Sequence, residues 1–159
     1  MVNRHPGDQD SSLLGNKKIF KDSSLLEAIG ALDELNAWLG WVRAVVDNKI
    51  FDLIRIQKDL GKIMAELACF GGEKLSSDDL RFLEQITTQC EKKVKPITEF
   101  VIPGDNKDEA IVNIARTVCR RAERRVVALS RQRKVSSLVL AYLNRLSTLL
   151  FCWLVILRQ

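Results

Sequence analysis

Residues 115–125 contain the densest group of side chains that could do chemistry. On a helix, Arg116, Arg120 and Glu123 fall on one face, because the steps between them are four and three residues. Two guanidinium groups one turn apart, with a carboxylate to orient them, can hold a polyphosphate through charge-assisted hydrogen bonds. The alternative is a solvated face whose charges pair along the helix. Lysine would serve solubility equally well, so the run of arginines favours an anion site.

The positive charge of the chain is concentrated around this group. The formal net charge is +5, and between Arg116 and Lys134 eight basic residues stand against one acidic residue. Nucleic-acid binding by such a segment would usually involve a broad basic face or aromatic side chains among the cations. Residues 107–134 contain no Phe, Tyr or Trp. A compact anion site therefore suits the pattern at least as well.

Two further polar groups could contribute to the same site. Asp33, Asn36 and Gly40 follow one another at helical spacing, and Asp33 could pair with an arginine of the basic segment, within one chain or across a subunit contact. An exposed helix face is the alternative. Near the N-terminus, glycine, small hydroxyls and lysines suit contacts to phosphate, although a polar terminus without a role would look the same. These N-terminal residues are Gly7, Asp8, Ser11, Ser12, Lys17, Lys18 and Lys21.

Five helical segments must position these side chains, and they predict an all-α fold, a four- or five-helix bundle. The first begins at Ser24 with a capping box and carries apolar residues at steps of three and four up to Val46. We expect the others at about residues 50–70, 76–95, 107–134 and 136–157, with a short extended piece at 100–104. No strand pattern competes with them. Residues 1–22 are expected to form an arm, and residues 23–159 a single bundle domain.

Composition excludes several classes of protein. The chain has 159 residues, of which 47% are hydrophobic and 28% charged, so a disordered or fibrous chain is excluded and one soluble domain is expected. The four cysteines form no CxxC pair and the single histidine is His5, so we expect no metal site and four buried free thiols in a reducing cytoplasm. We expect no signal peptide, and the apolar run at residues 149–157 is too short to cross a bilayer.

Several motifs, in their order along the chain, resemble those of a known family. The two most specific are the run from Ala115 to Arg125 and the run from Tyr142 to Ser147. Weaker ones lie at residues 21–36, 56–68 and 100–104. Over nearly its whole length the chain resembles the ATP:cob(I)alamin (corrinoid) adenosyltransferases of the propanediol-utilisation type, which are trimeric helical bundles.

The resemblance implies a reaction and partners. Members of the family transfer the 5′-deoxyadenosyl group of ATP to the cobalt of cob(I)alamin and release triphosphate, so ATP with Mg²⁺ and a corrinoid would be the substrates. Cobalt is the nucleophile, which leaves the protein to position the substrates and to stabilise the departing triphosphate. A cytoplasmic homotrimer with sites between subunits is also implied. A reductase and a cobalamin-dependent mutase would be its partners.

The resemblance also implies roles for single residues. Phe100 matches an aromatic side chain on the lower face of the corrin, where it excludes the axial base. Asp33 and Arg116 match a pair that joins neighbouring subunits, and with Phe100 and Arg120 they are the expected catalytic residues. The matches to nucleotide contacts are Arg120, Arg121, Glu123, Arg124 and Asn144. The matches to a phosphate-holding N-terminal arm are Gly7, Asp8, Ser11, Ser12 and Lys21.

The sequence departs from the family pattern at a few positions. Pro6 stands where the family usually has Thr, and one glycine of the arm is missing. Asp105, Asn113 and Thr148 replace a frequent Gly, His and Asp. These changes bear on affinity and activity more than on the fold. The alternative hypothesis is therefore a catalytically weakened trimer that binds ATP or a corrinoid and acts in cofactor delivery.

Overall fold

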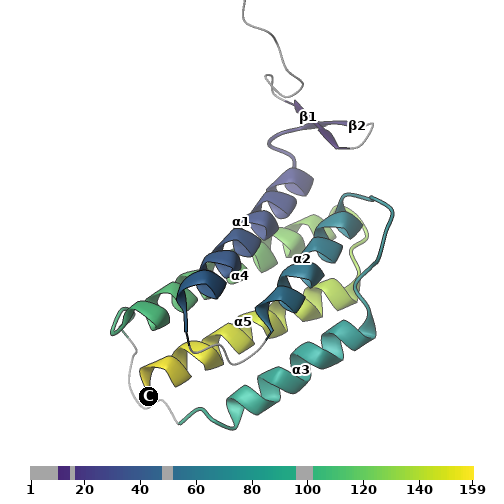
Figure 1. The fold of residues 1–159 in the computed structure, drawn as a ribbon. Coiled ribbons are helices and arrows are strands. Elements are labelled where there is room, and N and C mark those ends of the chain that lie inside the picture. The colour runs from purple at the N-terminus through teal and green to yellow at the C-terminus, as the bar shows by residue number, and fades with distance from the viewer. Residues whose placement is uncertain (1–10, 15–16, 48–51, 96–101) are drawn as a thin grey trace, which may run out of the picture.

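The computed structural model describes residues 11–14, 17–47, 52–95 and 102–159. Within these ranges five long helices form a bundle, and a hairpin extends from the N-terminal end of the first helix (Figure 1). The expected all-α bundle is confirmed. The helices are α1 (Ser24–Val45), α2 (Leu53–Leu67), α3 (Ser77–Glu91), α4 (Lys107–Ser130) and α5 (Ser137–Arg158).

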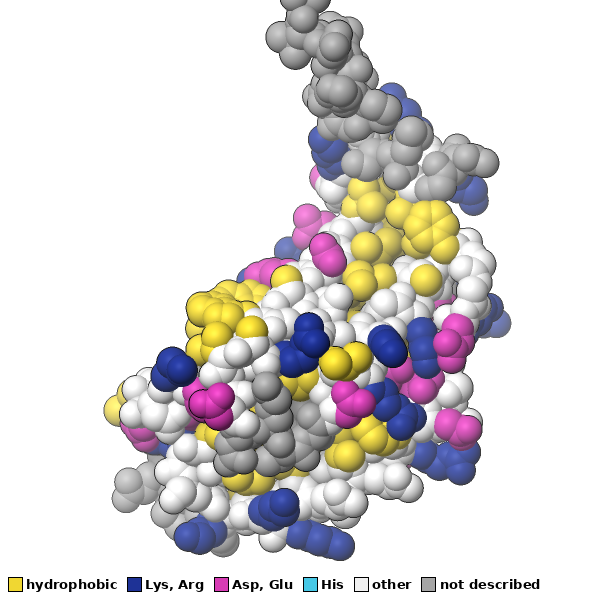
Figure 2. Space-filling model, in the orientation of Figure 1, with side chains coloured by type: hydrophobic (Ala, Val, Ile, Leu, Met, Phe, Trp, Pro, Cys, Tyr) yellow, Lys and Arg dark blue, Asp and Glu magenta, His cyan; other side chains and the backbone are white. Residues whose placement is uncertain are grey.

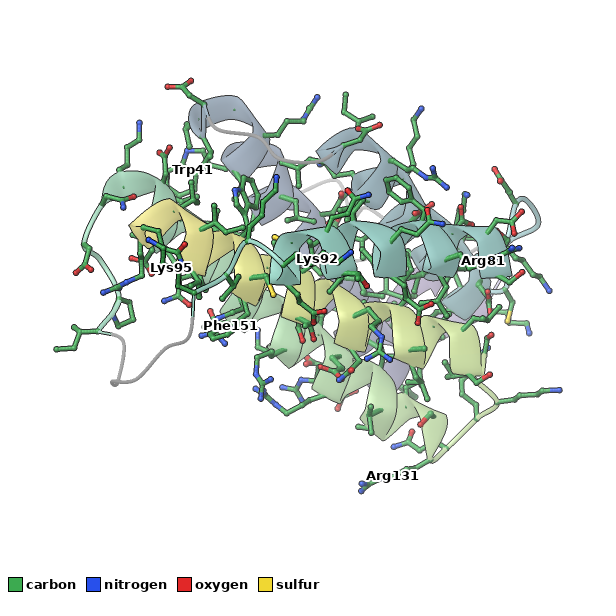
Figure 3. All side chains as sticks on the ribbon, turned by 90° about the horizontal axis from the view of Figure 1, so that it is seen from below. Trp41, Arg81, Lys92, Lys95, Arg131 and Phe151 are labelled. Carbon is green, nitrogen blue, oxygen red and sulfur yellow. The ribbon has the colours of Figure 1, made fainter. Side chains whose placement is uncertain are left out.

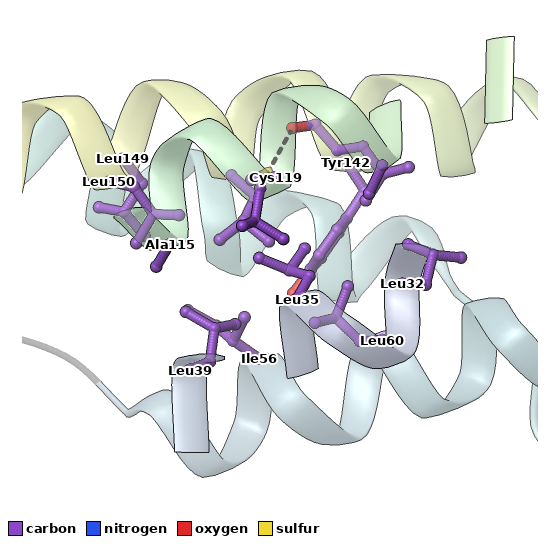
Figure 4. Close-up of a cluster of buried hydrophobic side chains, with 14 of the residues drawn as sticks. Leu32, Leu35, Leu39, Ile56, Leu60, Ala115, Cys119, Tyr142, Leu149 and Leu150 are labelled. Atoms are coloured by element: carbon purple, nitrogen blue, oxygen red, sulfur yellow. Dashed lines mark hydrogen bonds between the residues drawn. The ribbon is translucent and has the colours of Figure 1, made fainter. Parts of the chain in front are cut away.

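The helices pack in a fixed order around one core. Helix α1 packs against both α2 and α4, and α5 packs against both α4 and α3. The α1 seam expected from the sequence is buried, since Leu32, Leu35 and Leu39 are 0% exposed. They meet apolar side chains of α2, α4 and α5 in the cluster of Figure 4. Each leucine removed from water in this way contributes roughly 1.5 to 3 kcal/mol, so this cluster holds α4 between α1 and α5.

Side-chain caps set where the helices begin. The N-cap of α1 is Ser23, whose hydroxyl accepts from the Leu26 amide, so the expectation of a capping box at Ser24 was one residue late. Ser76 caps α3 in a full capping box with Asp79, so this helix begins at Ser77, close to its expected start. Asn106 caps α4 by accepting from the Glu109 amide at 2.9 Å. This cap fixes the start of the basic helix.

A buried polar network joins three of the helices. Asp59 on α2 is 1% exposed and accepts a hydrogen bond of 3.0 Å from the Tyr142 hydroxyl on α5. Lys62, one turn further along α2, pairs with Asp59 at 3.2 Å and with Asp79 of α3 at 3.2 Å. Burial raises the pKa of Asp59. Removing one member would leave a buried charge without its partner, so the network ties α2, α3 and α5 into one arrangement.

Two expectations about local structure were wrong, and the first was that the chain shows no strands. The N-terminal segment contains strands β1 (Ser11–Leu14) and β2 (Lys17–Phe20), which pair antiparallel with Ser11 opposite Phe20. Each strand has two polar residues followed by two apolar ones, so neither shows the alternation of polar and apolar residues that indicates a strand.

The second wrong expectation was that all four cysteines are buried. Cys90, Cys119 and Cys152 are buried as expected, but Cys69 is exposed. It follows the end of α2 with φ +58°, and an Arg133 guanidinium nitrogen lies 3.0 Å from its sulfur. Burial raises the pKa of Cys90 to about 12, so that thiol stays protonated at neutral pH.

Helix α5 is the most apolar element of the described chain. Of the described helices it alone has the length and composition of a membrane span, with a mean hydropathy of 1.7 over an 18-residue window. In the bundle 61% of that window is buried. A central helix of a bundle has the same composition, because it is surrounded by other helices.

Candidate functional site

The arginines of α4 project from two sides of the helix. Arg121 pairs with Glu34 of α1, and Arg125 pairs with Glu27 of α1 at 3.4 Å. These two arginines therefore face α1. All four side chains are about half exposed, so each pair contributes at most about 1 kcal/mol. Their effect is to fix the rotation of α4 against α1.

Arg120 and Arg124 occupy the outward face of α4. Both are exposed, and within the described residues neither forms a hydrogen bond or an ion pair. They are one helical turn apart, so their guanidinium groups can reach the same ligand. The opposite face of α4 is anchored in the core by five buried side chains, Ile111, Ala115, Val118, Ala122 and Leu129. The outward pair is thus presented to solvent by a helix that is held on its other side.

A hydrogen bond between α4 and α5 borders this pair. The Asn144 side-chain amide of α5 donates to the Glu123 carboxylate of α4 at 3.0 Å. Glu123 is half-buried and Asn144 exposed. The sequence analysis named both residues, and the structure brings them together. The contact holds the Asn144 carbonyl oxygen away from Glu123, where it can accept from a ligand.

Arg116 lies one helical turn before Arg120, and we call the side of α4 that carries Arg116, Arg120 and Arg124 the arginine face. It is partly buried, and burial together with the nearby Arg120 charge lowers its pKa. Its Nε donates to the Asn113 side-chain oxygen at 2.9 Å. Asp33 is exposed on α1, and within the described residues of one chain no ion pair joins it to an arginine. An Asp33–Arg116 pair between two chains stays a prediction.

The N-terminal candidates are only partly described. Ser11 is buried in β1, and Ser12 pairs through its backbone register with Ile19 of β2. Lys21 is exposed just after β2. Gly7 and Asp8 lie outside the described residues, and so does Phe100. The roles expected of all these residues stay predictions.

Three departures from the family pattern have structural counterparts. Asp105 forms an ion pair with Arg158 at the end of α5. Asn113 is buried, donates to Glu109 and accepts from Arg116. Thr148 lies one turn beyond Asn144 and lines a polar hollow of about 430 Å³ between α3 and α5. The other residues of that hollow are Glu84, Thr87, Thr88, Glu91 and Arg145.

The sequence analysis missed Glu109 of α4. It is 0% exposed, and its carboxylate accepts a hydrogen bond of 2.7 Å from the Gly104 amide in the preceding loop. Asn106 followed by Glu109 is the spacing of a capping box, which could have indicated a structural role. Burial of the carboxylate could not have been expected, because the first turn of a helix is usually solvated.

Charges on the face formed by α1 and α2 are mixed. In Figure 2 acidic and basic side chains alternate there with separate hydrophobic groups. A broad basic surface of the kind that coats nucleic acid is not present on this face of the described chain. The arginines of α4 stay the candidate anion site, because they lie closer together along the sequence than the basic residues of this face.

Known proteins share both the sequence pattern and the fold. The family model for cobalamin adenosyltransferases matches residues 3–157. A corrinoid adenosyltransferase of Bacillus subtilis is 34% identical over 154 residues, which covers 91% of this chain and 80% of that protein. A cobalamin adenosyltransferase of Cupriavidus metallidurans is 34% identical over 149 residues, covering 91% and 81%.

A solved structure gives the corresponding fold comparison. It is a variant PduO-type ATP:corrinoid adenosyltransferase from Lactobacillus reuteri, complexed with cobalamin and ATP. It superposes with a TM-score of 0.85 at 25% identity, over 95% of this chain and 90% of that one.

Proposed function

This chain belongs to the cobalamin adenosyltransferase family, and we propose that it transfers the 5′-deoxyadenosyl group of ATP to the cobalt of cob(I)alamin. The observation that carries the proposal is a match over nearly the whole chain, combined with the outward face of α4, where Arg120 and Arg124 have no hydrogen-bond or ion-pair partner among the described residues. Such a pair can receive the triphosphate that this reaction releases.

The reaction requires little covalent chemistry from the protein. The electron pair of cob(I)alamin attacks the 5′ carbon of ATP, a cobalt–carbon bond forms, and the bond from that carbon to the triphosphate oxygen breaks. The electron pair of the broken bond leaves with the triphosphate. Charge grows on the bridging oxygen as the bond breaks, so positioned donors lower the barrier by stabilising it. ATP enters with Mg²⁺, which the phosphates largely hold.

The α4 and α5 side chains divide this work. Arg120 and Arg124 contact the triphosphate with charge-assisted hydrogen bonds. Arg121 is engaged by Glu34, so it adds positive field rather than a free donor. The Glu123–Asn144 pair orients the nucleoside, because its hydrogen bond fixes the free carbonyl of Asn144. This division follows the roles that the resemblance implies, except that Arg121, expected as a nucleotide contact, pairs with Glu34 instead.

The remaining sequence predictions extend the site beyond one chain. Asp33 of one subunit pairs with Arg116 of the next in a homotrimer, and the N-terminal arm holds the phosphates through Gly7, Asp8, Ser11, Ser12 and Lys21. Phe100 packs against the lower face of the corrin. The protein acts in the cytoplasm, receives reduced corrinoid from a reductase and supplies a cobalamin-dependent mutase. In support, Arg116 has neutral Asn113 as its hydrogen-bond partner within the chain, which leaves its charge available.

The test is direct. The protein is incubated without oxygen with ATP, Mg²⁺ and chemically reduced cobalamin, and the spectrum is followed while triphosphate is measured. Adenosylcobalamin and triphosphate in equal amounts are expected. Binding of ATP and corrinoid without either product would instead favour the alternative of a weakened trimer that delivers the cofactor. Binding of neither substrate would contradict both.

A further inference from the structure

A chain of hydrogen bonds runs along the first three turns of α4. Glu109 accepts from the Gly104 amide at 2.7 Å and, more weakly, from the Asn113 side-chain amide at 3.5 Å. The Asn113 side-chain oxygen accepts from Arg116 Nε at 2.9 Å. The three side chains are at steps of four and three residues, so they lie on one face of the helix. This series of hydrogen bonds thus connects the loop before α4 to the arginine face.

The loop at one end of this series of hydrogen bonds is held by several contacts. Gly104 has φ +107°, a backbone conformation that glycine adopts without strain. Arg158, at the end of α5, donates to the Ile102 carbonyl at 2.8 Å and lies 4.0 Å from the Glu109 carboxylate. Burying a carboxylate is costly unless it is paired and hydrogen-bonded. Gly104, Arg158 and Asn113 together meet that requirement, so Glu109 fixes residues 102–105 against α4.

Asn113 is chemically suited to its place between Glu109 and Arg116 in this series of hydrogen bonds. A carboxamide donates from its nitrogen and accepts at its oxygen while carrying no charge. Glu109 on one side can only accept, and Arg116 on the other can only donate. A carboxylate at position 113 could not donate to Glu109, and an apolar side chain could serve neither neighbour. The buried amide is therefore the link through which a shift at one end reaches the other.

We propose that Glu109 and Asn113 are positioning residues that join the 102–105 loop to Arg116, so that ATP and corrinoid affect each other's affinity through this link. The inference rests on the proposed function, because it is the resemblance that assigns the corrin to Phe100, just before the loop, and the nucleotide to the arginine face. Coupling of two sites is reciprocal. Tighter corrinoid binding in the presence of ATP therefore accompanies tighter ATP binding in the presence of corrinoid.

The experiment measures this coupling rather than activity alone. The dissociation constant of cob(II)alamin, which carries no nucleophilic electron pair, is measured with and without saturating MgATP, at pH 8. We expect the wild-type ratio of the two constants to be about fivefold or more, the lower end of typical site-to-site coupling. In Asn113→Leu the ratio should fall below about twofold. In Asn113→His it should be retained, because a neutral imidazole also donates at one nitrogen and accepts at the other.

Controls separate the link from general damage. Thr88→Val removes a side-chain hydrogen bond on α3, far along the chain from Glu109, and should leave the ratio unchanged. If Asn113→Leu does not fold, Asn113→Ala is measured in its place against the same two outcomes. An unchanged ratio in the variant that lacks the amide, or a wild-type ratio of one, overturns the inference.

The proposed function is tested separately on the same samples. Wild-type protein that makes adenosylcobalamin but shows no loss of coupling in the Asn113 variants contradicts the inference alone. Wild-type protein that makes no adenosylcobalamin contradicts the proposed function, and if it also binds neither substrate the inference falls with it.

Discussion

Asn144 of α5 donates its side-chain amide to the Glu123 carboxylate of α4 across 3.0 Å. The two residues belong to different helices and to different motifs of the sequence. The α4–α5 packing brings them together at the edge of the arginine face. Their hydrogen bond joins the two most specific runs of the sequence side chain to side chain.

Replacing Asn144 by Asp should weaken ATP binding. The new carboxylate would stand about 3 Å from that of Glu123, and unpaired like charges at this distance oppose each other. We expect KM for ATP to rise by roughly ten- to a hundredfold, which corresponds to about 1 to 3 kcal/mol. Adding Glu123→Gln should recover much of the loss, because the Gln amide can donate to the new carboxylate. Steady-state kinetics are measured on the wild type, the two single variants and the double variant. A KM for ATP in the double variant as high as that of Asn144→Asp would contradict the role of the pair.

Reversing the charges of Asp33 and Arg116 should test the contact between subunits. Asp33→Arg and Arg116→Asp alone should each lower the assembly state and the activity, and the double variant should recover part of both. Asp47→Arg reverses another exposed acidic side chain near α1 and serves as the control. Sedimentation velocity and activity are measured together. A stable monomer with full activity would exclude a site shared between chains.

Phe100→Ala should distinguish the two oxidation states of the corrinoid. If Phe100 keeps the axial base away from cobalt, its removal slows the reaction from cob(II)alamin with a reductant far more than the reaction from pre-reduced cob(I)alamin. Ile102→Ala removes a 71%-exposed apolar side chain from the same segment and should leave both rates nearly unchanged. A core role would instead cost about 3 to 5 kcal/mol of stability and lower both rates alike. Both rates and the melting temperature are measured on each variant.

Asp79 should make stability depend on pH. Burial raises its pKa, but hydrogen bonds from Ser76 and Lys62 lower it by more, so the pKa lies below the ordinary 3.8. Its contribution is therefore complete above pH 3.8 and is lost as the pH falls through the lower pKa of the folded protein. Asp79→Asn should cost about 2 to 3 kcal/mol at pH 7, and its disadvantage should shrink below pH 3.8.

The adjacent Asp78 supplies the control. It is 74% exposed and among the described residues its one ion pair is with Arg81, one turn along α3, so Asp78→Asn should change the free energy of unfolding by less than about 0.5 kcal/mol. Denaturant unfolding at pH 3 and pH 7 measures all three proteins. Equal losses for Asp78→Asn and Asp79→Asn would show that the buried network does not stabilise the bundle.

The helices could be predicted from the sequence because their apolar residues recur with the period of a helix. Leu32, Leu35 and Leu39 are buried where that period places them, and α3 begins at Ser77, close to its expected start at residue 76. The hairpin could not be predicted from periodicity, since the polar and apolar residues of its two strands do not alternate. Cys69 was misassigned because an apolar pattern near a helix end does not show where the chain turns away from the core.

The site was predictable in its residue types more than in its pairings. The arginine run indicated an anion site, but only the packing of α1 against α4 separates Arg121, held by Glu34, from Arg120, which has no such partner in the part of the chain that the structure describes. Glu109 escaped notice because a carboxylate in the first turn of a helix ordinarily faces water. Its burial depends on Arg158, which lies at the far end of α5 and far away in the sequence.

The central claim is that the outward arginines of α4 stabilise the departing triphosphate, and Arg120→Ala tests it most directly. Arg131→Ala is the matched control. It removes the same exposed charge, eleven residues further along the chain, or about 16 Å along the helix axis, and Figure 3 shows Arg131 projecting from the far end of α4. The measurement is kcat/KM for adenosylcobalamin formation from cob(I)alamin, with the melting temperature of each variant.

The account predicts that Arg120→Ala lowers kcat/KM by about a hundred- to a thousandfold, the loss of roughly 3 kcal/mol expected when one donor to a developing charge is removed. Its melting temperature should stay close to that of the wild type, because Arg120 makes no hydrogen bond or ion pair within the described residues. Arg131→Ala should keep nearly full activity. A value for Arg120→Ala within a factor of two of the wild type, or an equal loss in both variants, would contradict the account.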